Sequence, residues 1–169
     1  MSNLVIYFSR SGENYFGGNL KNIEKGNTEV IAEYIQNFCD AELFKVEALN
    51  DYPYDYMECI DIAKKEMEND ERPQIKESLS DISAYDTIFI GFPNWWGTLP
   101  MPMFTQLEKL NWEGKTIRVF TTHEGSGLGN VVLDVKRICN NAIVLDNSLA
   151  ISGSEVNTAK SKVEDWINN

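Results

Sequence analysis

Three separated segments of this chain carry residue types that could bind a small molecule. The first begins after an apolar run with Ser9-Arg10-Ser11-Gly12, and resumes at Gly26-Asn27-Thr28, directly before an amphipathic stretch. Hydroxyl groups and backbone N–H groups at the start of a helix are suited to hold a phosphate. We therefore predict a phosphate site at this strand, turn and helix start. Its predicted residues are Ser9, Arg10, Ser11, Gly12, Asn27 and Thr28.

The spacing within this segment excludes two common nucleotide-binding signatures. Neither the G-x-G-x-x-G of dinucleotide sites nor the G-x-x-x-x-G-K-[ST] of triphosphate sites follows the apolar run. The remaining interpretations are a cradle for a single terminal phosphate without metal, or an ordinary helix cap and turn. The residues between, Glu13 to Lys25, exceed the roughly two to six that usually connect a strand to a helix. They form either a functional flap or a surface loop.

The second and third segments could hold a planar ring. In the second, Trp95 and Trp96 offer flat surfaces for stacking, or fill the core under the next helix. We expect at least one of them to contact a ring. The third segment is rich in glycine, which lets backbone approach a ligand closely. The predicted ring-binding residues are Pro93, Asn94, Trp95, Trp96, Gly97, Thr122, His123, Glu124, Gly125 and Gly127.

No catalytic residue and no metal site are predicted. His123, the only histidine, is either a proton donor near the ring or a hydrogen-bonded loop residue. It has no second histidine or acidic cluster nearby to complete a metal site. Ser126 lies in Glu124-Gly125-Ser126-Gly127-Leu128, which does not match the G-x-S-x-G of a nucleophilic serine.

These segments follow apolar runs that alternate with helical patterns, which is typical of an α/β fold. We expect a single domain that spans residues 1–169. The expected strands are 4–8, 43–49 (at an edge), 87–92, 116–121 and 142–145, the last interrupted at 146–148 and resumed at 149–151. The expected helices are 28–38, capped by Asn27 or Thr28, and about 56–69, 103–110, 131–139 and 155–167. We predict a three-layer fold with a five-stranded parallel sheet of order 2-1-3-4-5 and helices on both faces. Its ligand site lies where the three segments meet, beyond the carboxyl ends of strands 1, 3 and 4.

The composition restricts the partners. A net charge of −11 argues against nucleic acid and against an anionic membrane surface. It is compatible with a partner protein that carries a basic patch, or it serves solubility. Cys39, Cys59 and Cys139 are scattered and form no C-x-x-C, which suits a reducing compartment. Without a leader sequence or an apolar run of about 20 residues, the chain is expected to be cytoplasmic.

The three segments together resemble the flavodoxins, and in particular flavodoxin-like FMN proteins with a lengthened first loop. Ser9-Arg10-Ser11-Gly12 with Asn27-Thr28 is similar to the family's S/T-x-S/T-G-N-T phosphate loop, divided by an insertion. Gly91 to Gly97 looks like the family's second loop, and Thr122 to Gly127 like its third. The resemblance covers essentially the whole chain and agrees with the predicted fold.

The resemblance implies FMN as the cofactor. Ser9, Ser11, Asn27 and Thr28 would then bind its phosphate, with Arg10 acting mostly through its backbone. Residues 93–97 and 122–127 would hold the isoalloxazine ring. The insertion leaves open which of Gly12, Glu13 and Asn14 touches the phosphate.

The family also implies a function, electron transfer between redox partner proteins, namely a reductase and an acceptor. An acidic protein with few cations near the ring disfavours an anionic reduced flavin and would lower its reduction potential. The first alternative is an NAD(P)H-dependent quinone or small-molecule reductase on the same fold. The second is a binding module that holds no flavin, or a degenerate scaffold. The sequence assigns neither the physiological partner nor the oligomeric state.

Overall fold

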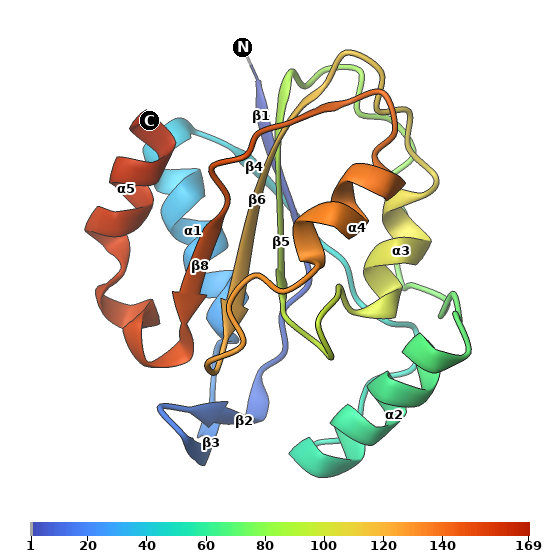
Figure 1. The fold of residues 1–169 in the computed structure, drawn as a ribbon, viewed down its shortest axis with the longest axis vertical. Helices are drawn as coiled ribbons and strands as arrows, with labels where there is room; N and C mark the ends of the chain where they lie inside the picture. The colour runs from blue at the N-terminus through green and yellow to red at the C-terminus, as the bar shows by residue number, and fades with distance from the viewer. Residues whose placement is uncertain (1) are drawn as a thin grey trace.

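A parallel sheet runs through the middle of the molecule, and helices cover both of its faces (Figure 1). The computed structural model describes residues 2–169. The strands of this sheet are β1 (Asn3–Tyr7), β4 (Glu42–Lys45), β5 (Thr87–Pro93), β6 (Thr116–His123), β7 (Ile143–Val144) and β8 (Leu149–Ser152). The helices are α1 (Asn27–Cys39), α2 (Tyr56–Glu68), α3 (Met101–Leu107), α4 (Val131–Ile138), the 3₁₀ helix η1 (Gly153–Thr158) and α5 (Lys160–Asn168).

The predicted fold class is confirmed, and the strand order differs only at the fifth strand. The order is β4-β1-β5-β6, with β4 at an edge as predicted, and both β7 and β8 pair with β6. β7 lies along the beginning of β6 and β8 along its end. Between them the polar residues Asp146 to Ser148 leave the sheet, where the Asn147 carbonyl accepts a hydrogen bond from the Trp166 indole. The sheet therefore has six strands rather than five.

Both faces of the sheet are buried, which explains the continuous apolar run of the first strand. Val5 and Tyr7 point to the side covered by α1 and α5, while Leu4 and Ile6 point to the side of α3 and α4. Successive side chains of a strand alternate between faces, so a central parallel strand needs apolar residues at every position. The core is thus two layers on either side of one sheet.

The expected second strand ends four residues early, at Lys45 rather than Leu49. Beyond Lys45 the chain turns toward the segment around Ile75 and pairs with it in the antiparallel direction. The Leu49 N–H donates to the Gln74 carbonyl at 2.8 Å, and the Lys76 N–H donates to the Glu47 carbonyl at 2.9 Å. Residues 46–49 therefore leave the sheet, and residues 46–48 form part of one wall of a cavity described below.

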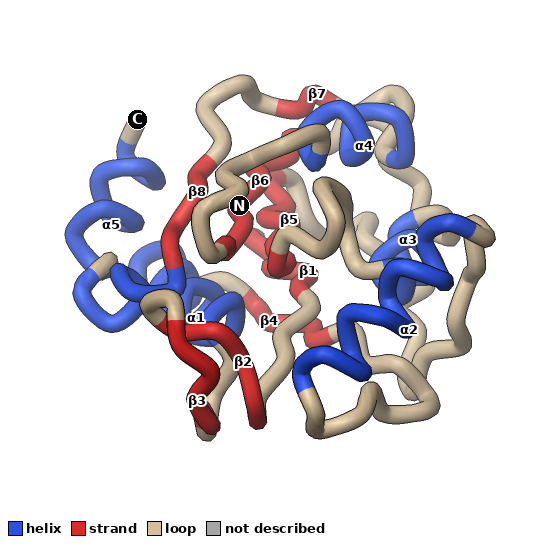
Figure 2. Tube along the Cα trace, turned by 60° about the horizontal axis from the view of Figure 1, so that its bottom comes forward, coloured by secondary structure: helices blue, strands red, loops and turns tan. Residues whose placement is uncertain are grey.

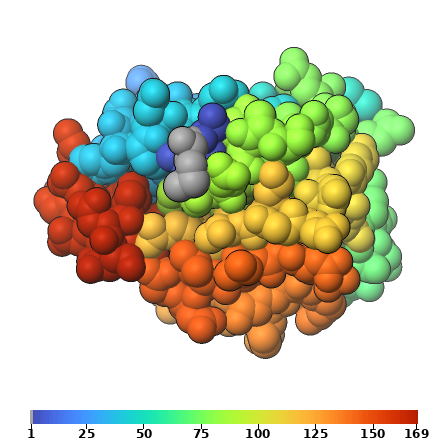
Figure 3. Space-filling model, turned by 90° about the horizontal axis from the view of Figure 1, so that it is seen from above, coloured from blue at the N-terminus to red at the C-terminus, as the bar shows by residue number. Residues whose placement is uncertain are grey.

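The C-terminal helix is fastened to the middle of the sheet by a buried arginine. The Arg118 guanidinium, on β6, donates hydrogen bonds to the carbonyls of Trp166 and Ile167 at 2.5 and 2.7 Å. It also lies 4.8 Å from the centre of the Trp166 ring. These contacts satisfy carbonyls at the end of α5 that have no partner within the helix. Figure 3 shows this end of the molecule, with α5 in red beside the light-blue segment of α1.

The insertion in the first loop forms an antiparallel hairpin of β2 (Gly12–Phe16) and β3 (Asn19–Ile23). Its turn is Gly17-Gly18, with φ values of 65° and 86°. Positive φ at both central residues is the geometry of the tight turns that suit hairpins. Every residue of the two strands is half-buried or exposed. The hairpin lies outside both layers of the core.

No helix within residues 2–169 combines the length and the apolar character that crossing a membrane requires.

Candidate functional site

The three predicted segments meet at the carboxyl end of the sheet, beyond β1, β5 and β6. Figure 2 shows this end of the molecule, with β2 and β3 at one side and α2 at the other. Adjacent pairing of these strands brings the loops together, because the carboxyl ends of parallel strands lie at one edge.

The first loop passes very close to the start of α1 at Gly26. A Cβ atom at Gly26 would lie 2.1 Å from the Ser9 Oγ and 2.7 Å from the Arg10 carbonyl oxygen. Gly26 is the N-cap of α1, so the predicted cap at Asn27 or Thr28 is wrong. The Ser9 hydroxyl instead accepts a hydrogen bond from the Glu29 N–H at 3.1 Å. Ser9, at the other end of the inserted loop, thus accepts the hydrogen bond from the first turn of α1 that an N-cap side chain usually accepts.

Thr28 is buried and joins the first loop to the third. Its hydroxyl lies 2.8 Å from that of Thr122, and both residues are almost inaccessible to solvent. The bond fixes the start of α1 against the end of β6.

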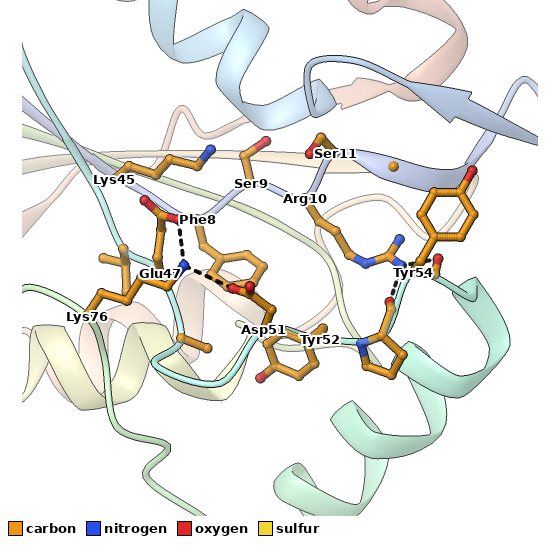
Figure 4. A pocket seen from close by; sticks show the side chains of 14 residues that line it. Phe8, Ser9, Arg10, Ser11, Lys45, Glu47, Asp51, Tyr52, Tyr54 and Lys76 are labelled. Carbon is orange, nitrogen blue, oxygen red and sulfur yellow. Dashed lines mark hydrogen bonds and ion pairs between the residues drawn. The ribbon is translucent and has the colours of Figure 1, made fainter.

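The Arg10 side chain is engaged by the protein itself. Its guanidinium donates hydrogen bonds to the carbonyls of Glu13, Pro53 and Tyr54, the latter two at 2.7 and 2.8 Å. Figure 4 shows it pointing away from Ser9 toward Tyr54. Arg10 therefore ties the first loop to the segment before α2, and its backbone carbonyl accepts a hydrogen bond from the Asn14 side chain at 2.8 Å.

Two adjoining hollows open between these loops. The larger, here called the ring cavity, has a volume of about 190 Å³. It is lined by Asn14, Tyr15, Asn27, Tyr56, Pro93, Asn94, Trp95, Thr122, His123, Glu124 and Ser126. The smaller, the helix cleft, has about 40 Å³ at the start of α1. It is lined by Arg10, Asn14, Asn27, Thr28, Pro93, Trp95 and Thr122.

A third hollow, the side cavity, lies on the other side of the first loop (Figure 4). It has about 430 Å³ and is bounded by residues 8–12, residues 45–48, residues 51–54 and Lys76. Ser9, Ser11 and Gly12 line this cavity, whereas Asn27 and Thr28 line the helix cleft. The structure therefore divides the predicted phosphate residues between two hollows, with Arg10 in both.

An aromatic cluster separates the side cavity from the ring cavity. The Trp95 ring packs edge-on against Phe8 and Tyr52, with centroids 5.1 and 5.2 Å apart. Trp95 lines the ring cavity, while Phe8 and Tyr52 line the side cavity. Burial and a hydrogen bond to the Glu66 carboxylate both raise the pKa of the Tyr52 hydroxyl, so this wall stays uncharged at neutral pH.

The structure brings Trp95 to the ring cavity and directs Trp96 away from it. Trp96 has a φ of 57°, unusual for a large residue, and its indole N–H donates to the Ile60 carbonyl on α2 at 2.9 Å. The Lys64 ammonium lies 5.0 Å from the Trp96 ring centre. Trp96 therefore packs beside α2. Trp95 lines the ring cavity and also packs against the hydrophobic core, which was the other interpretation of the tryptophan pair.

Asn94 holds the second and third loops together. Its side-chain amide donates to the Gly127 carbonyl and its carbonyl oxygen accepts from the Gly97 N–H, both at 2.9 Å. Gly125 and Gly127 have φ values of 116° and 63°, which only glycine adopts readily. The third loop is thus shaped by its glycines and anchored by one asparagine.

His123 and Glu124 each have protein partners. The His123 Nδ1 accepts a hydrogen bond from the Gly125 N–H at 2.9 Å, which assigns the proton of the neutral ring to Nε2. The Glu124 carboxylate accepts from the Gly18 N–H at 3.3 Å, at the hairpin turn. Within residues 2–169 no group of His, Cys, Asp and Glu side chains could hold a metal ion.

The sequence reasoning missed two residues that line the ring cavity, Tyr15 and Tyr56; it placed Ser126 within the third segment and left Asn14 open as a phosphate contact. Asn14 and Tyr15 lie on the hairpin, and Tyr56 begins α2. Burial raises the pKa of the Tyr56 hydroxyl, so it too remains uncharged at neutral pH. The Gly17-Gly18 pair was the one local signal that could have predicted the hairpin.

The comparisons with known proteins agree with this arrangement. The family model for flavodoxin matches residues 2–169. A flavoprotein from Lactobacillus acidophilus NCFM, solved in complex with FMN, is 26% identical, with a TM-score of 0.67 over 93% of this chain and 97% of that one. A solved protein from Bacteroides uniformis ATCC 8492 is 24% identical, with a TM-score of 0.77 over 99% and 98%. The oxidised flavodoxin 2 of Bacillus cereus is 20% identical, with a TM-score of 0.57 over 99% of both chains. None of the curated proteins matches.

Proposed function

The chain belongs to the flavodoxin family, and on that premise we propose that it binds FMN and carries electrons between partner proteins. The observation that carries this proposal is the junction of the helix cleft with the ring cavity. The cleft lies at the positive end of α1, and the cavity beside it is bounded by Trp95 and by peptide groups of the third loop. When bound, FMN supplies a ring that takes up and releases electrons.

The residues at the helix cleft fit a phosphate group. The N–H groups of Asn27 and Thr28 belong to the first turn of α1 and have no acceptor within the helix. The close approach at Gly26 holds the first loop against this turn. Several amides can thus donate to one anion without a metal, as the sequence predicts.

The residues at the ring cavity fit a planar, largely apolar ring. Trp95, Tyr15 and Tyr56 provide aromatic surface, and the Asn94 and third-loop peptide groups provide polar contacts. Among the described residues that line this cavity there is no Lys or Arg, and there is one carboxylate, Glu124. This charge distribution disfavours added negative charge on the ring, and supports a reduction potential below that of free FMN.

The partners we propose are a reductase and an acceptor protein. The net charge of −11 supports association with proteins that carry a basic patch, because opposite fields increase the rate of encounter. The three cysteines are free, which supports a place in the reducing cytoplasm.

Reconstitution with FMN tests the proposal. The protein with FMN should show the absorbance band of a bound flavin at about 450 nm, and its reduction potential should be below that of free FMN. It should not oxidise NADPH with a quinone unless a separate reductase is added. Turnover by the protein alone would favour the NAD(P)H-dependent reductase instead. Failure to bind FMN would contradict both functions.

A further inference from the structure

The hairpin of β2 and β3 is joined to the start of α2. The rings of Tyr15 and Tyr56 pack edge-on, with centroids 4.9 Å apart. The Glu13 carboxylate accepts a hydrogen bond from the Tyr56 N–H at 3.0 Å, and the Tyr54 hydroxyl donates to the Asn22 side-chain oxygen at 3.0 Å. One side of the hairpin is therefore fixed to the start of α2 by one aromatic and one polar contact, and to the segment before α2 by a second polar contact.

The turn of the same hairpin is joined to the third loop. The Gly18 N–H donates to the Glu124 carboxylate at 3.3 Å. Glu124 and Tyr56 both line the ring cavity, so the hairpin runs from one wall of the cavity to another. Figure 2 shows the hairpin beside the ends of the central strands and facing α2. The hairpin thus closes one side of the ring cavity, with Tyr15 as the side chain that meets α2.

The space that remains is small. The ring cavity has about 190 Å³ and the helix cleft about 40 Å³, so a flavin bound between the loops takes up this space. The side cavity adds no room at the ring, because the cluster of Phe8, Tyr52 and Trp95 lies between. Tyr15 lines this cavity from the hairpin, so a second planar molecule that stacks on a bound flavin from that side has to displace the Tyr15 ring.

We propose that Tyr15, held against Tyr56, is a specificity-determining residue that excludes small hydride donors from the flavin and leaves electron exchange to protein partners. This inference rests on the proposed function and names the class of partner that the site accepts. A dihydronicotinamide must lie over the ring to lose a hydride and become a pyridinium cation, with the hydride accepted by FMN. A one-electron donor needs only to approach an edge, so the wall excludes the first kind of donor and not the second.

The hairpin can be altered without loss of the fold. None of the residues in its two strands is fully buried, and the contacts of Tyr15 given above lie outside the two core layers. Replacing Tyr15 with alanine therefore removes part of the cavity wall and leaves both core layers intact. Phe16 offers a matched control, because it is the neighbouring aromatic residue, lies beneath the Lys21 ammonium at 5.4 Å, and is not among the residues that line the ring cavity.

The test compares wild-type protein with Tyr15→Ala and Phe16→Ala. First, FMN association with the apoproteins is followed by flavin fluorescence. We expect faster association for Tyr15→Ala alone, because the wall no longer has to move aside. Second, the FMN-loaded proteins are mixed anaerobically with 1-benzyl-1,4-dihydronicotinamide, a small hydride donor, and separately with reduced methyl viologen, a one-electron donor. We expect Tyr15→Ala to react about tenfold faster with the hydride donor and within about twofold of wild type with the viologen.

Tyr56→Ala serves as a second variant, since it removes the ring that Tyr15 packs against, and the same direction of change is expected. Equal hydride rates in wild type and Tyr15→Ala, with FMN bound in both, would overturn the inference and leave the proposed function standing. Loss of FMN by both tyrosine variants would also overturn it, because the pair would then hold the cofactor. Failure of the wild type to bind FMN would instead refute the proposed function, and the inference with it.

Discussion

The hydroxyls of Thr28 and Thr122 lie 2.8 Å apart, in a place that solvent hardly reaches. Thr28 stands in the first turn of α1, and Thr122 stands near the end of β6, 94 residues further along the chain. This single bond therefore joins the helix cleft to the third loop. Both residues line that cleft, so the bond also sets its width.

Thr28→Val keeps the shape of the side chain and removes one partner of this bond. The Thr122 hydroxyl is then left buried without its partner, which we expect to lower the free energy of unfolding by about 1–3 kcal/mol. Urea unfolding of the apoprotein measures the change. The double variant Thr28→Val/Thr122→Val should lose less than the sum of the two single variants. Strictly additive losses would show that the two hydroxyls do not depend on each other.

The two adjacent tryptophans should differ in their effect on the cofactor. Trp95→Leu removes the ring that lines the ring cavity, and we expect FMN to bind at least about tenfold more weakly, or 1.4 kcal/mol. Trp96→Leu removes a ring that packs beside α2, so FMN affinity should change by less than about twofold. Titration of each apoprotein with FMN, followed by flavin fluorescence, measures both. Equal losses would mean that Trp96 also reaches the ring.

Gly26→Ala tests the close approach between the first loop and α1. The added methyl group would meet the Arg10 carbonyl oxygen at 2.7 Å, and a backbone atom cannot yield as a flexible side chain can. We expect the loop to move off the helix start and FMN to bind at least about tenfold more weakly. Riboflavin, which has no phosphate, should lose much less affinity than FMN. Lys25→Ala, at an exposed neighbouring position, is the control and should bind FMN as wild type does.

The sequence was sufficient to predict the layers and the meeting of the three loops at one end of the sheet. A central parallel strand is buried on both faces, so a continuous apolar run such as Leu4 to Phe8 predicts one. The loops that follow such strands lie at the same edge of the sheet. The sequence did not predict where the side chains in those loops point, because their directions depend on residues far away in the chain. Trp96 turns away because the chain takes a positive φ there and α2 offers the Ile60 carbonyl.

The same dependence explains the errors at the first loop. The sequence assigned the cap of α1 to Asn27 or Thr28, which are local to the helix. The acceptor comes instead from Ser9, 20 residues from Glu29 in the chain, because Gly26 lets the loop approach. Rules for helix caps consider only residues next to the helix, so they do not predict a hydrogen bond between Ser9 and Glu29.

The position of the hairpin outside both core layers has a consequence for how this protein can change over time. Asn14 and Tyr15 of this hairpin line the ring cavity, yet no residue of either strand is fully buried in the two core layers. Surface segments of this kind tolerate sequence change far better than buried elements do. The wall of the ring cavity can therefore diverge among descendants of this chain while both core layers stay the same.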